Sequence, residues 1–206
     1  MVEPGMTDAG GLPLLLAFLA GYLAGSVPFG LVFTRLAGAG DVRRIGSGNI
    51  GATNVLRTGR KGLAAATLLA DILKGALPVL AARFLLGEEA AALAGAGAVL
   101  GHCFPVWLRF KGGKGVATAA GIMLGFAPLV LPFVLALFIA VVWFSRFVSL
   151  GSIVAALAAP LAAWLLGYPL GVWLFAVVAL VIIVQHRENL GRLLAGRENR
   201  ITLGSR

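Results

Sequence analysis

Long apolar stretches, separated by short polar ones, occupy most of the 206-residue chain. They predict membrane-spanning helices, because a helix needs about 20 apolar residues to cross a bilayer. We expect an all-α integral membrane protein, a seven-helix bundle with spans near residues 12–34, 62–84, 90–106, 116–128, 129–145, 148–166 and 169–185. The spans between residues 116 and 145 are short, so one of them either stops within the bilayer or lies where the bilayer thins.

The charges decide how the stretch 116–145 is divided. Pro128 and Pro132 are compatible either with a turn between two helices or with kinks in one long helix. Two helices place all 17 Lys and Arg residues except Lys74 and Arg83 on one face of the membrane. Because Lys and Arg concentrate on the cytoplasmic side, we expect two helices, an outside N-terminus and a cytoplasmic C-terminus.

The composition favours one membrane domain over residues 1–206. Hydrophobic residues make up 60% of the chain and charged residues 12%. We expect an extracytoplasmic N-terminal segment at about 1–11 and a cytoplasmic amphipathic tail at 186–206. The first span is too long for a cleaved signal peptide, and the basic residues that precede such a signal do not occur before it. The net charge of +9 follows the positive-inside bias, and no nucleic-acid motif accompanies it, so we expect no nucleic-acid partner.

Two glycine-rich basic segments interrupt the apolar pattern, at 45–57 and 111–118. Glycine exposes backbone N–H groups, and together with fixed positive charge these groups can surround a phosphate. The candidate residues are Gly46, Ser47, Gly48, Asn49, Thr53, Asn54 and Arg57 in the first segment and Gly112, Gly113, Lys114, Gly115 and Thr118 in the second. The alternative is a pair of surface turns whose basic residues only fix the topology.

Neither segment is a nucleotide-binding signature. The GxGxxG pattern of the first segment lacks the strand and helix of a βαβ unit. The second segment has Leu108 where a phosphate loop needs its first glycine, and Gly115 where it needs Ser or Thr. A weaker physical expectation remains, which is binding of an anion by backbone donors and polar side chains.

A third polar cluster, at 186–189, follows the last predicted span. His186 and Asn189 share one face if the helix continues, because they are three residues apart. An interfacial amphipathic tail with snorkelling basic side chains is the alternative. It explains the arginines of the tail better than it explains these two residues.

Asp71 and Lys74 lie inside the second predicted span, where charges are costly and often functional. Their i, i+3 spacing also allows them to neutralise each other, and we favour a structural pair that supports the loops. His102 ends the third span and is expected to be a packed interface residue. Cys103 is the only cysteine, which excludes an internal disulfide, and its apolar neighbours favour a packed thiol over a nucleophile.

Several common catalytic patterns do not occur in the sequence. The cytoplasmic side has no dense carboxylate group to hold catalytic magnesium. Neither histidine is followed by the aspartate of an HxxxxD acyltransferase motif, and no GxSxG nucleophile elbow occurs. We therefore expect no metal and no cofactor.

The three clusters taken together, GSGNIGATNVLR (46–57), GHCFPVWLRFKGGKGVAT (101–118) and HRENLGRLLAGRE (186–198), resemble the bacterial acyl-phosphate:glycerol-3-phosphate acyltransferase family in order and spacing. The resemblance implies a metal-free, seven-helix enzyme of phospholipid biosynthesis in the bacterial cytoplasmic membrane, with its active site on the cytoplasmic side. It implies transfer of a fatty acyl group from acyl phosphate to the 1-hydroxyl of glycerol 3-phosphate, giving lysophosphatidic acid and inorganic phosphate. The partners implied are these substrates, the lipid bilayer and the upstream acyl-phosphate-forming enzyme.

By this resemblance the catalytic and phosphate-binding residues are Ser47, Arg57, Lys114, His186 and Asn189, with the turn 112–115 as a phosphate loop. We hypothesise that Arg57, His186 and Asn189 hold glycerol 3-phosphate and that the turn holds the acyl-phosphate head. Either His186 or a substrate phosphate accepts the hydroxyl proton. The rival function is a membrane transporter of a phosphorylated small anion, which is disfavoured because all three clusters fall on one face.

Overall fold

The computed structural model describes residues 10–201, and this part of the chain is helical without any strand. The predicted extracytoplasmic segment therefore lies almost entirely outside the described residues, as does the end of the predicted tail. The helices are α1 (Gly11–Gly25), α2 (Phe29–Leu36), α3 (Ala52–Val55), α4 (Lys61–Leu86), α5 (Glu88–Cys103), α6 (Val116–Phe126), α7 (Val130–Ser145), α8 (Val148–Leu165), α9 (Pro169–Gln185) and α10 (Arg187–Leu194). Short 3-10 turns occupy Val42–Arg44, Leu56–Thr58 and Val106–Leu108.

Each predicted span corresponds to apolar helical structure. Four stretches of the described chain are long and apolar enough to cross a bilayer, namely Gly11–Leu36, Lys61–Leu86, Glu88–Leu108 and Val148–Leu165. A fifth results if α9 and α10, which are bent by 61°, are counted as one span. The helices α6 and α7 are shorter, and the turn between them contains Pro128, which confirms the prediction of two helices in this stretch. The total of seven spans stays a prediction.

The first predicted span is broken between α1 and α2. Pro28 disfavours helical backbone at Val27, so the helix ends at Gly25 and restarts at Phe29. The carbonyl of Val27 accepts a hydrogen bond of 2.8 Å from the ammonium group of Lys74. A buried lysine of α4 therefore supports a break that the sequence pattern did not predict.

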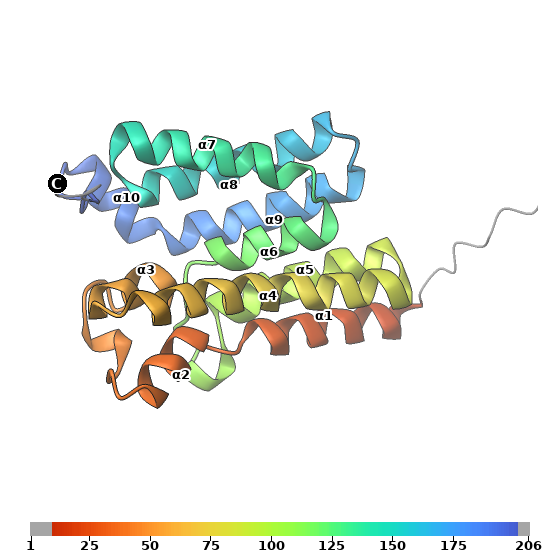
Figure 1. Cartoon of the computed structure of the whole chain (residues 1–206). Helices are drawn as coiled ribbons and strands as arrows, with labels where there is room; N and C mark the ends of the chain where they lie inside the picture. Colours follow the sequence, from red (N-terminus) through yellow and green to blue (C-terminus); the bar gives the residue numbers. More distant parts are fainter. Residues whose placement is uncertain (1–9, 202–206) are drawn as a thin grey trace, which may run out of the picture.

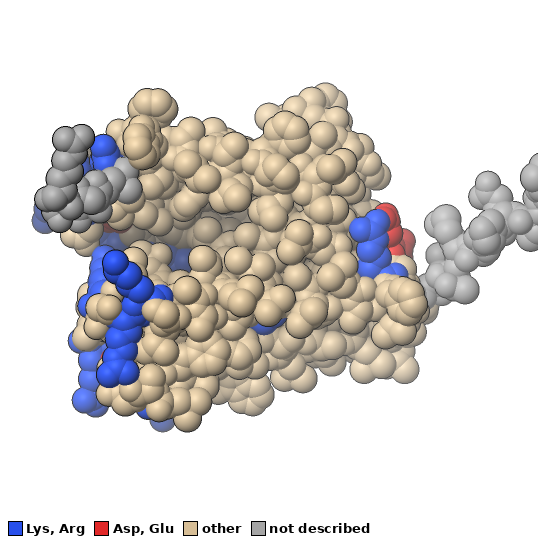
Figure 2. Space-filling model, in the orientation of Figure 1, with Lys and Arg blue, Asp and Glu red and all other residues tan. Residues whose placement is uncertain are grey.

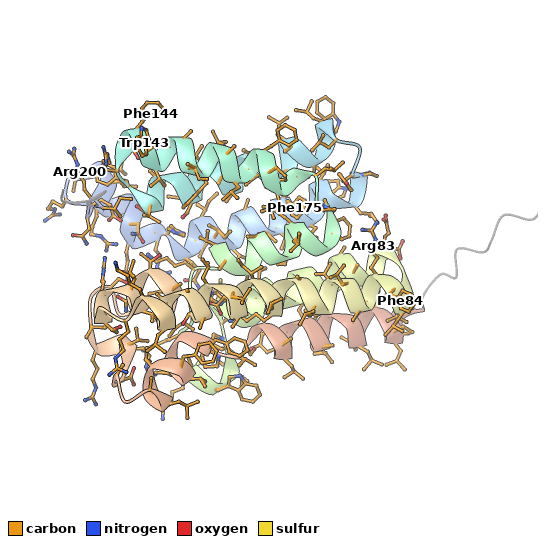
Figure 3. The ribbon with its side chains drawn as sticks, in the orientation of Figure 1. Arg83, Phe84, Trp143, Phe144, Phe175 and Arg200 are labelled. Atoms are coloured by element: carbon orange, nitrogen blue, oxygen red, sulfur yellow. The ribbon has the colours of Figure 1, made fainter. Side chains whose placement is uncertain are left out.

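The helices pack in two groups, which meet mainly where α5 packs against α9 (Figure 1). In the first group α1 lies along α5 and α4 lies along α6, while in the second α8 packs against both α7 and α9. Glycine permits the closest approach, since a methyl group at Gly25 would overlap the carbonyl of Ala98. Phe175 fills the interior edge-on to Phe126, with ring centroids 6.4 Å apart, whereas Phe84 points outward and is 90% exposed (Figure 3). Such an exposed aromatic side chain suits contact with lipid.

Charged side chains divide between the two ends of the bundle (Figure 2). Most Lys and Arg side chains in this view gather at the end formed by α2, α3 and α10. At the opposite end Arg83 pairs with Glu88 at 2.6 Å. This asymmetry is typical of a membrane protein whose basic end faces the cytoplasm.

Candidate active site

The amide of Asn54 organises the first glycine-rich segment. Its Nδ2 donates to the carbonyls of Val42, Ile45 and Asn49 at 2.8, 3.1 and 2.8 Å. Its Oδ1 accepts a hydrogen bond of 3.0 Å from the N–H of Ser47. Asn54 is buried, and its hydrogen-bonding groups are used within the protein, so it holds the segment in shape and fixes the position of Ser47.

Arg57 lies against the same segment and is exposed. Its guanidinium reaches the Oδ1 of Asn54 at 3.5 Å, which leaves most of its donors available to a ligand. Gly46 has a φ of +53°, and a methyl group there would overlap the Oδ1 of the buried Asn54. Glycine is therefore required at this position by both the backbone conformation and the space that the Asn54 amide occupies.

The end of α5 clamps the second glycine-rich segment. The N–H of Gly112 donates to the carbonyl of Cys103 at 3.1 Å, and the N–H of Gly113 donates to that of His102 at 3.0 Å. Gly115, with a φ of +84°, then turns the chain into α6. The two amides that the glycine pattern offered for a phosphate are thus occupied, and Lys114 with the first amides of α6 is the remaining donor set.

The second and third clusters meet directly through Lys114 and Asn189. The Lys114 ammonium group donates to the Oδ1 of Asn189. The Nδ2 of Asn189 donates at 2.6 Å to Glu198, whose carboxylate also accepts from Ser149 at 2.8 Å and from Arg192 at 2.7 Å. Glu198 and Ser149 were not predicted as site residues. Glu198 belongs to the third motif and offered a signal, whereas Ser149 stands in an apolar helix and offered none.

His186 is buried at the bend between α9 and α10. Its Nδ1 lies 2.8 Å from the carbonyl of Ile182, and because a carbonyl only accepts, Nδ1 carries the proton. The Nε2 atom is then an acceptor. This tautomer suits a side chain that receives a hydrogen bond from a hydroxyl group.

Electrostatics couple the three clusters. Burial lowers the pKa of Lys114, and the positive charges of Arg192 and Arg57 lower it further. Burial also lowers the pKa of His186 to about 4, with a contribution from Lys114, so the imidazole is neutral at neutral pH. Burial opposes ionisation of Glu198, but hydrogen bonds from Asn189 and its other donors outweigh it and lower the pKa of this carboxyl group.

A cavity of about 620 Å³ lies where the three segments converge. It contains four basic side chains and no acidic one, and it is lined by Arg43, Gly48, Phe104, Trp107, Leu108, Arg109, Phe110, Lys111, Gly112, Gln185 and Arg187. Of the predicted site residues only Gly48 and Gly112 line it. The five predicted catalytic residues are not among its walls, although Gly48 and Arg187 are chain neighbours of two of them. This cavity suits an anionic ligand that approaches the site.

The remaining predicted residues have different surroundings. Thr53 is exposed, whereas Thr118 is fully buried in the first turn of α6, and its hydroxyl has no hydrogen-bond partner in the described chain. Asn49 accepts a hydrogen bond of 2.9 Å from the N–H of Gly51 and so shapes its own turn. Within residues 10–201 no three His, Cys, Asp or Glu side chains are grouped as metal ligands, and we assign no metal site.

Most of the chain matches a known protein family. The family model, described as Glycerol-3-phosphate acyltransferase, matches residues 15–196. The chain belongs to this family. It is 55% identical over 188 residues to the glycerol-3-phosphate acyltransferase of Nitrobacter winogradskyi, with 91% of this chain and 95% of the relative covered. It is 54% identical over 198 residues to that of Agrobacterium fabrum, with 95% and 97% covered.

Two solved structures of the acyltransferase family are similar to this fold. They are crystal structures of PlsY, described as an integral membrane glycerol 3-phosphate acyltransferase, in its glycerol 3-phosphate form and its lysophosphatidic acid form. The first has a TM-score of 0.87 and 41% identity, and covers 92% of this chain and 96% of that chain. The second has a TM-score of 0.85 and 40% identity, with 92% and 95% covered. The chain is therefore an acyltransferase-family membrane protein in both sequence and fold.

Proposed function

We propose that this protein transfers a fatty acyl group from acyl phosphate to the 1-hydroxyl of glycerol 3-phosphate, giving lysophosphatidic acid and inorganic phosphate in phospholipid biosynthesis. The names of the relatives and the two ligand forms of PlsY support this reaction. The observation that carries the proposal is the contact of Lys114 with Asn189, which joins two motifs beside a neutral histidine. Positive charge, an oriented amide and a hydrogen-bond acceptor are the groups that this reaction needs.

The reaction needs no covalent enzyme intermediate. Acyl phosphate is a mixed anhydride, so phosphate is a good leaving group. The hydroxyl oxygen of glycerol 3-phosphate forms a bond to the acyl carbonyl carbon, and the bond from that carbon to the phosphate oxygen breaks with its electron pair on phosphate. Correct placement of the two substrates and stabilisation of the developing negative charge supply the rate enhancement.

Each substrate phosphate requires positive charge, and the site offers two sources. Arg57 has a planar fork that matches a phosphate, and Ser47 lies on the same organised segment. We assign glycerol 3-phosphate to Arg57, His186 and Asn189. We assign the acyl-phosphate head to Lys114 and the amides at the start of α6, because the amides of Gly112 and Gly113 are already bound to carbonyls.

The proton of the attacking hydroxyl has two possible acceptors, and the pKa of His186 favours one of them. The Nε2 atom of neutral His186 accepts a hydrogen bond from the hydroxyl and orients it. With a pKa of about 4, this imidazole does not retain a proton at neutral pH. The proton therefore ends on a phosphate oxygen, whose second pKa is about 6.

The proposal includes a topology. We place the N-terminus outside, the C-terminus in the cytoplasm and the site at the cytoplasmic face of a bacterial cytoplasmic membrane, crossed seven times. The gathering of basic side chains at the end with α2, α3 and α10 supports this orientation (Figure 2). There the enzyme that forms acyl phosphate could deliver its product. A reporter fused to the C-terminus tests the orientation, and a readout from the extracytoplasmic side would contradict it.

The decisive experiment is conversion of both substrates by purified protein. Acyl phosphate and labelled glycerol 3-phosphate are incubated with the protein in lipid nanodiscs, without acyl-CoA, and lysophosphatidate is measured. We expect product with acyl phosphate and none with acyl-CoA as the sole donor. The Lys114→Met variant is the matched control. Binding of glycerol 3-phosphate without conversion, together with its uptake into proteoliposomes, would instead support the transporter.

A further inference from the structure

Three polar side chains inside the bundle have no part in the chemistry above. Asp71 and Lys74 form an ion pair of 2.7 Å, and each side chain is only 3% exposed. Lys74 also donates to the carbonyl of Val27 at the break between α1 and α2. Charged side chains buried this deeply in a membrane bundle are costly, so their presence implies a function or a strong structural reason.

His102 stands between this ion pair and the second glycine-rich segment. Its Nδ1 lies 3.9 Å from the Oδ1 of Asp71, and the side chain is 4% exposed. On its other side the ring lies directly beneath Gly113. A methyl group at Gly113 would overlap the Nε2 of His102 and come within 2.7 Å of its Cε1, and all three nearest atoms belong to this ring.

Glycine at position 113 is required by this ring and by nothing in its own backbone. Gly113 does not adopt a positive φ, so its conformation is open to any residue. Its N–H is bound to the His102 carbonyl and is not offered to a ligand. The space taken by the His102 ring is therefore what excludes a side chain there.

We propose that His102 is a positioning residue for the glycine turn and thereby for Lys114. The His102 ring packs directly against Gly113. The next residue, Lys114, carries the ammonium group that donates to Asn189. A change in the contact between the His102 ring and Gly113 therefore moves Lys114 relative to Asn189. The catalytic meaning of this placement rests on the proposed acyl transfer, whereas the placement itself does not.

The first test is a pair of compensating substitutions. Gly113→Ala is expected to lower kcat/KM by at least about 100-fold, because the methyl group displaces the turn from a rigid ring. His102→Ala removes the ring and with it the overlap. The double variant should therefore have a kcat/KM at least about tenfold higher than Gly113→Ala, which corresponds to about 1.4 kcal/mol. A double variant no more active than Gly113→Ala overturns the proposal.

Gly112→Ala is the matched control. A methyl group there would meet the carbonyl oxygens of His102 and Cys103, which are backbone atoms that His102→Ala leaves in place. His102→Ala should therefore rescue Gly113→Ala and not Gly112→Ala. Rescue of both would show a general loosening of the loop and would overturn the specific contact.

The kinetic constants distinguish positioning from a general effect on folding. His102→Ala is expected to raise the KM for one substrate, the one whose phosphate meets Lys114, several-fold more than the KM for the other. If His102→Ala only lowers the yield of active protein and leaves both KM values unchanged, the positioning role is overturned.

The native thiol of Cys103 gives a readout that does not need turnover. Cys103 is fully buried, and the segment packs over it, since a side chain at Gly115 would come within 3.2 Å of its Sγ. Maleimide labelling should be slow in the wild type, faster in Gly113→Ala and slow again in the double variant. Equal labelling in all three overturns the proposal. If labelling follows the expected order but the wild type makes no lysophosphatidate, the positioning stands and the proposed function fails.

Discussion

The ammonium group of Lys114 donates a hydrogen bond to the side-chain carbonyl of Asn189, 75 residues further along the chain. The contact joins the start of α6 to α10. Asn189 in turn donates to Glu198, so the carboxylate orients the amide and the amide orients the lysine. This chain of hydrogen bonds is the closest link between the second and third motifs.

A double-mutant cycle tests this link. Lys114→Met is expected to lower kcat/KM by about 100-fold or more, and Asn189→Ala by about 10- to 100-fold, as for hydrogen bonds to charged groups. Because both changes remove the same contact, the double variant should lose less than the product of the two single losses. Initial rates of lysophosphatidate formation give the three values. Losses that multiply would mean that the two residues act independently.

Glu198 should support the stability of the site. Glu198→Gln is expected to lower the temperature of thermal unfolding in detergent by a few degrees, because the carboxylate accepts from three side chains. Its pKa in the folded state is below the ordinary value of 4.5. Its contribution is therefore complete above pH 4.5 and is lost as the pH falls through the lower folded value.

The pH series supplies the measurement and Glu188 the control. The wild type should lose stability below pH 4.5 more steeply than Glu198→Gln. Glu188 is exposed and lies 3.9 Å from Arg192, so Glu188→Gln should leave the unfolding temperature unchanged. Equal effects of the two substitutions would remove the special role of Glu198.

The sequence predicted the helices well because their signal is local. Each predicted apolar run corresponds to helical structure within residues 10–201, and Pro128 together with the placement of Lys and Arg residues divided 116–145 into α6 and α7. The break at Pro28 also had a local signal, but it was hidden within one continuous apolar run. The count of membrane crossings stays a prediction, because helix length alone does not fix how α6 and α7 sit in a bilayer.

The sequence named candidate residues in three motifs but not the contacts that these residues make. Motif order and spacing selected Lys114 and Asn189, which the structure brings into contact. Asn54 and Gly113 were expected to face a ligand, yet one binds its own segment and the other fits over a histidine from α5. Such roles depend on how the chain folds back on itself in three dimensions, which the order and spacing of the motifs do not determine. Ser149 was missed for the same reason.

Close packing of α4 and α6 depends on Gly121. A methyl group there would overlap the carbonyl of Ile72, which cannot move without shifting α4. We expect Gly121→Ala to destabilise the protein by about 1–3 kcal/mol through overpacking. Gly62 has no atom within 4 Å of such a methyl group, so Gly62→Ala should be neutral or slightly stabilising. Thermal unfolding of both variants in the same detergent makes the comparison, and equal stability would contradict the packing argument.

Arg57 should bind phosphate through the bidentate geometry of its planar guanidinium group as well as through its charge. Arg57→Lys keeps the charge but loses bidentate geometry, so we expect the KM for glycerol 3-phosphate to rise about tenfold, the scale of one charge-assisted hydrogen bond. The KM for acyl phosphate should change little. Arg44→Lys is the control, since Arg44 is exposed in the same region. A rise in the acyl-phosphate KM alone would exchange the substrate assignments of the two segments.

The pH dependence of catalysis tests the neutral state of His186. Its folded pKa of about 4 lies below the ordinary 6.5, so the imidazole stays neutral as the pH falls from 6.5 toward 4 and protonates only near the lower value. The substrate phosphates titrate near pH 6 and produce their own change in kcat/KM. The profile of kcat/KM against pH should therefore have two limbs, one near pH 6 from the substrate phosphates and one near pH 4 from His186. In the slower variant His186→Gln, the limb near pH 6 should remain and the limb near pH 4 should disappear. If the limb near pH 6 vanished instead, His186 would titrate at its ordinary value and would be the group that takes up the hydroxyl proton.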